Sequence, residues 1–127
     1  MKKANIVEKY NAFIGSYGIT PQEFVLSAGG TCVMLGLREQ TQGMDMDVSA
    51  ELFYMLKHTQ RYRTIKLEDT EALHWNEHIK LHVGKPGPTQ VIDGVCCFSV
   101  LRLLEQKRKL NRPKDRTDIA ALMKLLY

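Results

Sequence analysis

The pattern of apolar and polar residues predicts β-strands in the middle of the chain. A strand with one buried face alternates between apolar and polar side chains, and short apolar runs beside turn residues also favour strands. By these criteria strands are expected at 24–26, 44–48, 61–67 (an edge strand) and 78–83, and as a hairpin over 91–98. The hairpin is expected to turn at Asp93-Gly94, a pair that favours the tight connection between two strands.

Apolar residues spaced three and four apart predict helices between and beside these strands. The first helix is expected over 3–15, with Gly15 and Gly18 ending it. A short helix is expected over 31–37, and a third runs over 51–59 after Ser49, whose hydroxyl can accept a hydrogen bond from an amide of the first turn.

The C-terminal part predicts a pair of helices. Ser99 opens the first, the segment 111–113 ends it, and the second begins near Pro113, a favourable first helical residue. The residues expected to face inward are Val100, Leu101, Leu103, Leu104, Ile119, Leu122, Met123 and Leu126. We therefore expect an α+β protein: a small mixed β-sheet flanked by helices, with a C-terminal helical pair, in a single domain over 1–127.

Composition and charge narrow the class of protein. The chain has 127 residues, 44% of them hydrophobic and 25% charged, which is typical of one globular domain. No uncharged apolar stretch approaches the roughly 20 residues of a membrane span, and the first residues lack the apolar segment of a signal peptide. Three cysteines make a poor disulfide framework, so we expect a cytoplasmic protein whose cysteines pack in the core. The net charge of +4 suits an anionic partner such as a nucleotide or nucleic acid.

Asp45 and Asp47 are the strongest candidates for chemistry. Residues two apart in a strand share a face about 7 Å apart, so the carboxylates can share one or two divalent cations. Such hard oxygen ligands suit Mg²⁺ held jointly with substrate phosphates. Because like charges repel, we expect that removing either charge raises stability or leaves it unchanged while no metal is bound. The alternative is an exposed strand face with solvated aspartates.

Gly29, Gly30 and Thr31 form a second candidate site. They lie between a predicted strand and a predicted helix, where backbone amides and the positive end of the helix dipole can receive a phosphate. The alternative is a tight strand-to-helix turn without a ligand.

The order of these elements carries a resemblance to a known family. Residues 24–48, FVLSAGGTCVMLGLREQTQGMDMDV, resemble the opening motif of minimal nucleotidyltransferases of the DNA-polymerase-β type, in which a Gly-Gly or Gly-Ser turn precedes an Asp-x-Asp strand. The pair Arg38-Glu39 is similar to one in the AbiEii-like toxins of that superfamily. The segment LLEQKRKLNRPKDRTDIAAL resembles the C-terminal helical segment of the same group, with matches at Lys107, Arg112, Asp115 and Asp118.

This resemblance implies an activity and a set of site residues. The activity is transfer of a nucleoside monophosphate from a Mg²⁺-bound nucleoside triphosphate to a hydroxyl of tRNA or other RNA, of a protein or of a small molecule, in a setting like toxin-antitoxin systems. Asp45 and Asp47 would bind the metal and form the catalytic group with Lys80 and His82. The residues implied to contact the nucleotide are Gly29, Gly30, Thr31, Arg38, Lys107, Lys114 and Asp115.

His82 marks a departure from the family pattern. The strand 78–83 resembles the family's Lys-apolar-acid strand, and Lys80 matches its lysine, but His82 stands at the position of the third acid. A neutral imidazole can accept a proton or ligate a metal, although it supplies no negative charge. A second interpretation is therefore a catalytically degenerate member that binds nucleotides, nucleic acid or protein.

The C-terminal helices also carry a run of basic residues. Such a run can contact RNA or phosphates, or it can be the solvated face of two helices. Its members are Lys107, Arg108, Lys109, Arg112, Lys114 and Arg116.

Overall fold

A seven-stranded mixed sheet forms the centre of the molecule within the described residues. The structure is a computed structural model that describes residues 1–59, 63–66, 71–76, 78–85 and 87–127. The strands are ordered β3-β4-β5-β2-β1-β7-β6. Their bounds are β1 Phe24–Ser27, β2 Met44–Val48, β3 Arg63–Lys66, β4 Glu71–Asn76, β5 Ile79–Val83, β6 Thr89–Ile92 and β7 Val95–Phe98. The expected α+β class with a small mixed sheet is confirmed.

Strand pairing fixes which side chains share a face. β2 is antiparallel to β1 and parallel to β5, and β1 is parallel to β7. One face of β2 and β5 carries Met44, Met46, Val48, Ile79 and Leu81, all of them buried. The opposite face of these strands therefore carries their polar residues.

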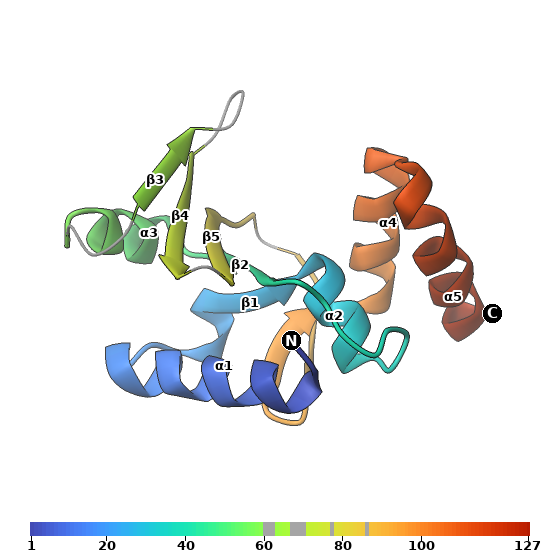
Figure 1. The fold of residues 1–127 in the computed structure, drawn as a ribbon, viewed down its shortest axis with the longest axis horizontal. Helices are drawn as coiled ribbons and strands as arrows, with labels where there is room; N and C mark the ends of the chain where they lie inside the picture. The colour runs from blue at the N-terminus through green and yellow to red at the C-terminus, as the bar shows by residue number, and fades with distance from the viewer. Residues whose placement is uncertain (60–62, 67–70, 77, 86) are drawn as a thin grey trace.

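The long helix α1, Lys3–Tyr17, covers the apolar face of the sheet (Figure 1). Its Phe13 stacks on Phe24 of β1 with the ring centroids 4.1 Å apart, and Trp75 of β4 meets Phe13 edge-on. The helix ends at Gly18, which has a positive φ of 59°. Gly15 lies inside the helix, so the expectation that it helps to end α1 is wrong.

Helix α2, Ala28–Met34, begins directly after β1 and earlier than expected. Gly29 and Gly30 are thus part of the first turn of the helix rather than a turn before it. Close packing requires a glycine at position 30, because a Cβ there would lie 2.6 Å from Cδ1 of Leu26. Helix α3, Ala50–Lys57, follows β2 and is capped by Ser49, whose Oγ accepts a hydrogen bond from the Leu52 amide as expected.

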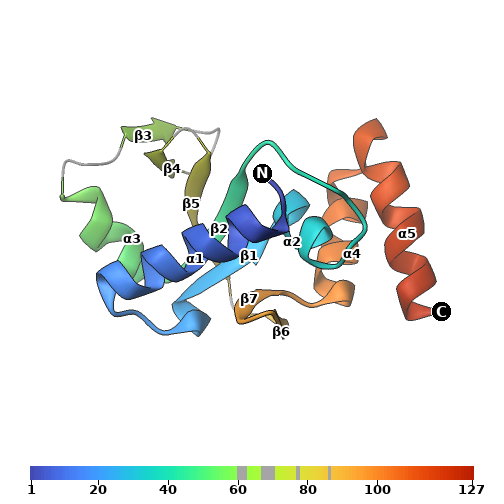
Figure 2. The same cartoon turned by 60° about the horizontal axis from the view of Figure 1, so that its bottom comes forward.

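The C-terminal helices α4, Val100–Leu110, and α5, Arg116–Leu126, lie side by side at one end of the molecule, away from β3 and α3 (Figures 1 and 2). A short 3-10 helix, η2, Pro113–Asp115, connects them. The predicted pair and its Ser99 cap are confirmed. Leu101 and Leu126 are 52% and 39% exposed, so the expectation that they face inward is wrong. In the described part of the chain no helix is long and apolar enough to cross a lipid bilayer.

The predicted edge strand and hairpin are also present. β3 lies at one edge of the sheet, although residues 61, 62 and 67 of its predicted range lie outside the described residues. β6 and β7 pair around Asp93 and Gly94, both at positive φ. The sequence pattern missed β4, because the adjacent apolar residues Ala72 and Leu73, both buried, break the alternation of a strand with one buried face.

Candidate functional site

The polar face of β2 and β5 brings together the acids and bases that the sequence singled out. In the parallel pairing, Asp45 lies opposite Lys80 and Asp47 lies opposite His82. Side chains at paired positions of parallel strands point to the same side of the sheet, so all four share one face. The hydroxyl of Ser27 donates to the backbone carbonyl of Asp45 at 3.0 Å, which ties this face to the end of β1 beside the glycines.

Asp45 forms a charge-assisted contact with the imidazole of His82. The distance from His82 Nε2 to Asp45 Oδ1 is 3.2 Å, with both side chains partly exposed. The hydrogen bond to His82 lowers the pKa of Asp45 below 3.8, and the charges of Lys80 and Arg112 add to this effect. The charge of Asp45 is therefore stabilised by its partners, and repulsion from Asp47 is not among the causes that set its pKa.

Asp47 has a different environment. Burial raises its pKa above 3.8, and the charge of Arg102 on α4 opposes that rise. Arg102 Nη2 lies 3.6 Å from Asp47 Oδ2, while the guanidinium also covers the Phe98 ring and donates to the Lys85 carbonyl. Arg102 was not among the predicted site residues. The sequence signal that could have found it is its position three residues after the Ser99 cap, on the first turn of α4.

Asp45 and Asp47 are the two carboxylates of this face that would hold a Mg²⁺ ion. Their contacts within the described residues use Oδ1 of Asp45 and Oδ2 of Asp47, which leaves one oxygen of each for a cation. No group of three or more His, Cys, Asp or Glu side chains in the described ranges is arranged to hold a metal. The protein would thus supply two hard oxygen ligands, and phosphate oxygens and water would complete the octahedral shell that Mg²⁺ requires.

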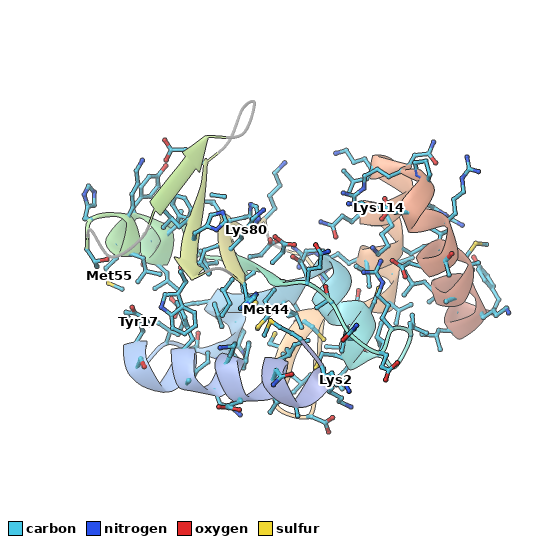
Figure 3. All side chains as sticks on the ribbon, viewed as in Figure 1. Lys2, Tyr17, Met44, Met55, Lys80 and Lys114 are labelled. Carbon is cyan, nitrogen blue, oxygen red and sulfur yellow. The ribbon has the colours of Figure 1, made fainter. Side chains whose placement is uncertain are left out.

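A polar cleft of about 470 Å³ opens beside Asp45. Lys80 lies on its sheet side, and Lys114 lies across from it on η2 (Figure 3). The lining residues are Thr41, Gln42, Gly43, Met44, Asp45, His78, Lys80, Arg112 and Lys114. Three of these side chains are permanent cations and only one is a carboxylate, so the cleft suits a polyanion.

The predicted phosphate-binding residues at the start of α2 are occupied by contacts within the protein. The Thr31 side chain is fully buried, and its hydroxyl donates to the Leu26 carbonyl at 2.9 Å. The space beside Gly29 is filled, because a Cβ there would lie 2.9 Å from Arg38 Nη1 and 3.0 Å from Thr41 Oγ1. Gly29, Gly30 and Thr31 are not among the residues that line the cleft.

Arg38, Lys107, Arg112, Asp115 and Asp118 form an ionic cluster that joins α4, η2 and α5 to the segment after α2. Arg112 donates through Nε and Nη2 to both oxygens of Asp115, and Arg38 does the same to Asp118. Lys107 Nζ lies between these carboxylates, 3.4 Å from Asp115 and 3.1 Å from Asp118. Lys107 and Asp115 are only 3% and 1% exposed, so their side chains are enclosed by the fold and do not reach the cleft surface.

The basic run on the C-terminal helices is therefore divided. Lys107 is buried, Arg112 and Lys114 line the cleft, and the rest of the run is exposed on the helical pair.

No protein-family model matches the chain, and no similar protein was found among curated proteins or solved structures.

Proposed function

We propose that this protein is a Mg²⁺-dependent nucleotidyltransferase, which transfers a nucleoside monophosphate from a nucleoside triphosphate to an acceptor hydroxyl. The observation that supports the proposal is the meeting of Asp45, Asp47, Lys80 and His82 on one accessible sheet face beside a cationic cleft. Two acids for a metal, cations for phosphate and an imidazole for a proton are the groups that phosphoryl transfer requires.

In this reaction the chain's own residues bind, orient and accept a proton. Asp45 and Asp47 hold Mg²⁺, which neutralises charge on the triphosphate when bound. Lys80 is exposed beside Asp45 and contributes positive charge near the phosphates. The acceptor oxygen bonds to the α-phosphorus, the bond from that phosphorus to the bridging oxygen breaks, and pyrophosphate leaves. The proton of the acceptor hydroxyl goes to His82, whose ring is oriented by Asp45.

His82 at the third-acid position also gives a second candidate function. Both aspartates already have basic partners, His82 and Arg102, which reduce the need for a metal to offset their charges. This arrangement favours a binding protein that retains nucleotide affinity without catalysis.

Calorimetric titration with ATP, CTP, GTP and UTP, with and without Mg²⁺, tests the proposal together with an assay of pyrophosphate release in the presence of RNA and protein acceptors. Magnesium-dependent binding and release of pyrophosphate support the enzyme. Magnesium-dependent binding without release in any acceptor mixture supports the binding protein. An absence of triphosphate binding overturns both.

Substitution of His82 separates the two functions further. In an enzyme, His82→Ala lowers the transfer rate by about 10²–10⁴-fold, the usual contribution of a general base, and His82→Asp retains activity. In a binding protein, His82→Ala leaves triphosphate affinity unchanged. Asp93→Asn, which alters a carboxylate on the β6–β7 turn, serves as the matched control.

A further inference from the structure

We propose that Arg112 and Lys114 of the C-terminal helical pair hold the triphosphate together with Lys80, and that Asp115 is the positioning residue that fixes Arg112 for this contact. The inference rests on the nucleotidyl transfer proposed above and names the part of the protein that binds the phosphates. It replaces the glycines of α2 as the expected phosphate site.

The first step of the argument is the distribution of charge across the cleft. Asp45 and Lys80 belong to the sheet side, whereas Arg112 and Lys114 belong to the segment around η2. A triphosphate that reaches Asp45 through a shared metal therefore has Lys80 on one side and two further cations on the other. Guanidinium and ammonium groups are the side chains that bind phosphate oxygens most strongly.

The second step is the way in which Arg112 is held. Its Nε and Nη2 donate to the two oxygens of Asp115 at 2.7 Å and 3.1 Å, so the plane of the guanidinium is fixed. These contacts use one edge of the fork and leave Nη1 for a ligand. The Arg112 side chain is 43% exposed, and the residue lines the cleft, so a phosphate can reach it.

The third step is that Asp115 itself cannot move easily. Its Oδ2 also accepts from the Arg112 backbone amide at 3.3 Å, and Lys107 Nζ approaches Oδ1. The carboxylate is buried, and its ion pairs continue through Lys107 to Asp118 and Arg38. A cation held by a fixed, buried carboxylate loses little conformational freedom when it binds a ligand.

The fourth step is the exclusion of the α2 glycines. Gly29 and Gly30 do not line the cleft, and a side chain at Gly29 has no room, because its Cβ would lie 2.9 Å from Arg38 Nη1. Thr31 has its hydroxyl committed to a backbone carbonyl. The cations at the cleft have no such obstruction among the described residues.

The test measures binding of inorganic tripolyphosphate and of Mg²⁺-ATP by calorimetry. Arg112→Gln is expected to raise the Kd for tripolyphosphate about tenfold or more, which corresponds to the loss of one charge-assisted hydrogen bond. Asp115→Asn is expected to raise the same Kd about threefold to tenfold in the parent protein. In the Arg112→Gln background it should raise the Kd less than about twofold, because Asp115 acts through Arg112. Lys109→Gln, at an exposed residue of α4 outside the cleft, is the control and leaves Kd unchanged.

Arg112→Lys decides the positioning role if Asp115→Asn does not fold. This variant keeps the charge but loses the planar fork, so it is expected to weaken Kd several-fold, with an unchanged melting temperature showing that the fold is intact. An unchanged Kd in Arg112→Lys, or additive effects of Arg112→Gln and Asp115→Asn, overturns the positioning role of Asp115. Parent-like affinity in Arg112→Gln overturns the phosphate contact while the proposed function stands, whereas a parent protein that binds neither probe overturns the proposed function itself.

Discussion

Two pairs of aspartates lie in basic surroundings in this protein, and they differ in how fully their oxygens are used. Asp115 and Asp118 are buried, and every carboxylate oxygen accepts from Arg38, Lys107 or Arg112. Asp45 and Asp47 are partly exposed, and the contacts given by the described residues use one oxygen of each.

The difference shows how one kind of side chain serves two purposes. A buried carboxylate whose two oxygens both accept from cationic side chains is costly to remove, because its loss leaves buried positive charge without a partner, and it is not accessible to a ligand. A carboxylate at the edge of a cleft, with one oxygen uncommitted, can bind a cation. The number of carboxylate oxygens already used by protein partners therefore separates the buried pair, Asp115 and Asp118, from the candidate metal ligands, Asp45 and Asp47.

Asp118→Asn gives the largest expected effect. It removes a charge between Arg38 and Lys107 and leaves a buried ammonium with a weaker set of partners. The free energy of unfolding, measured by urea denaturation, is expected to fall by about 3–5 kcal/mol. Asp93→Asn, whose ion pair with Lys3 is exposed on both sides, should cost less than about 1 kcal/mol. Equal losses in the two variants would contradict the structural role of the buried pair.

Asp47→Asn is expected to act on catalysis instead. Under the proposed function Asp47 is a metal ligand, and its loss should lower the nucleotide-transfer rate by about 10²–10³-fold, the order seen when one transition-state stabiliser is removed. Because burial raises the pKa of Asp47, its charge is unfavourable in the folded state, and the free energy of unfolding without metal should stay the same or rise. A large loss of stability with normal activity would reverse the assignment of the two pairs.

Acid denaturation sharpens the comparison further. Arg112 and the other partners lower the pKa of Asp115 from 3.8 to about 2. Its contribution is fully present above pH 3.8 and is lost as the pH falls towards about 2, a change of about 2 kcal/mol. Arg112→Gln removes the largest cause of the shift, so its urea stability should change less with pH in this window than that of the parent. Identical pH profiles would show that the pairing does not stabilise the folded state.

Alanine at Gly29 should give the smallest of these effects. The added Cβ would press on Arg38 Nη1 and Thr41 Oγ1, and the expected cost is about 1 kcal/mol in urea denaturation. Gly15→Ala is the control, because nothing lies within 4 Å of a Cβ there and the helix should gain about 0.5–1 kcal/mol. In the Asp118→Asn background the cost at Gly29 should shrink, since Arg38 is then less firmly held. A cost at Gly29 that does not depend on Asp118 would separate the glycine from the ionic cluster.

Local patterns in the sequence predicted the elements that carry the candidate site. The alternation at 44–48 and 78–83 correctly gave β2 and β5 and indicated that Asp45 and Asp47 share one face, as do Lys80 and His82. The Ser49 and Ser99 caps were also correct, because a cap depends on residues only three positions away. The start of α2 was wrong by about one turn, because glycines were taken to mark a turn before the helix, whereas Gly29 and Gly30 lie inside it.

The sequence by itself determined the strand and helix periods, the net charge and the order of acids, bases and glycines along the chain. Only the tertiary structure decided which of those side chains have their polar atoms engaged by other residues and which remain accessible to a ligand. Arg38 and Asp118 are 80 positions apart, and Arg102 reaches Asp47 from a different element. Such pairings depend on how helices dock on the sheet, and periodicity along the chain carries no information about the distance between side chains on separate elements.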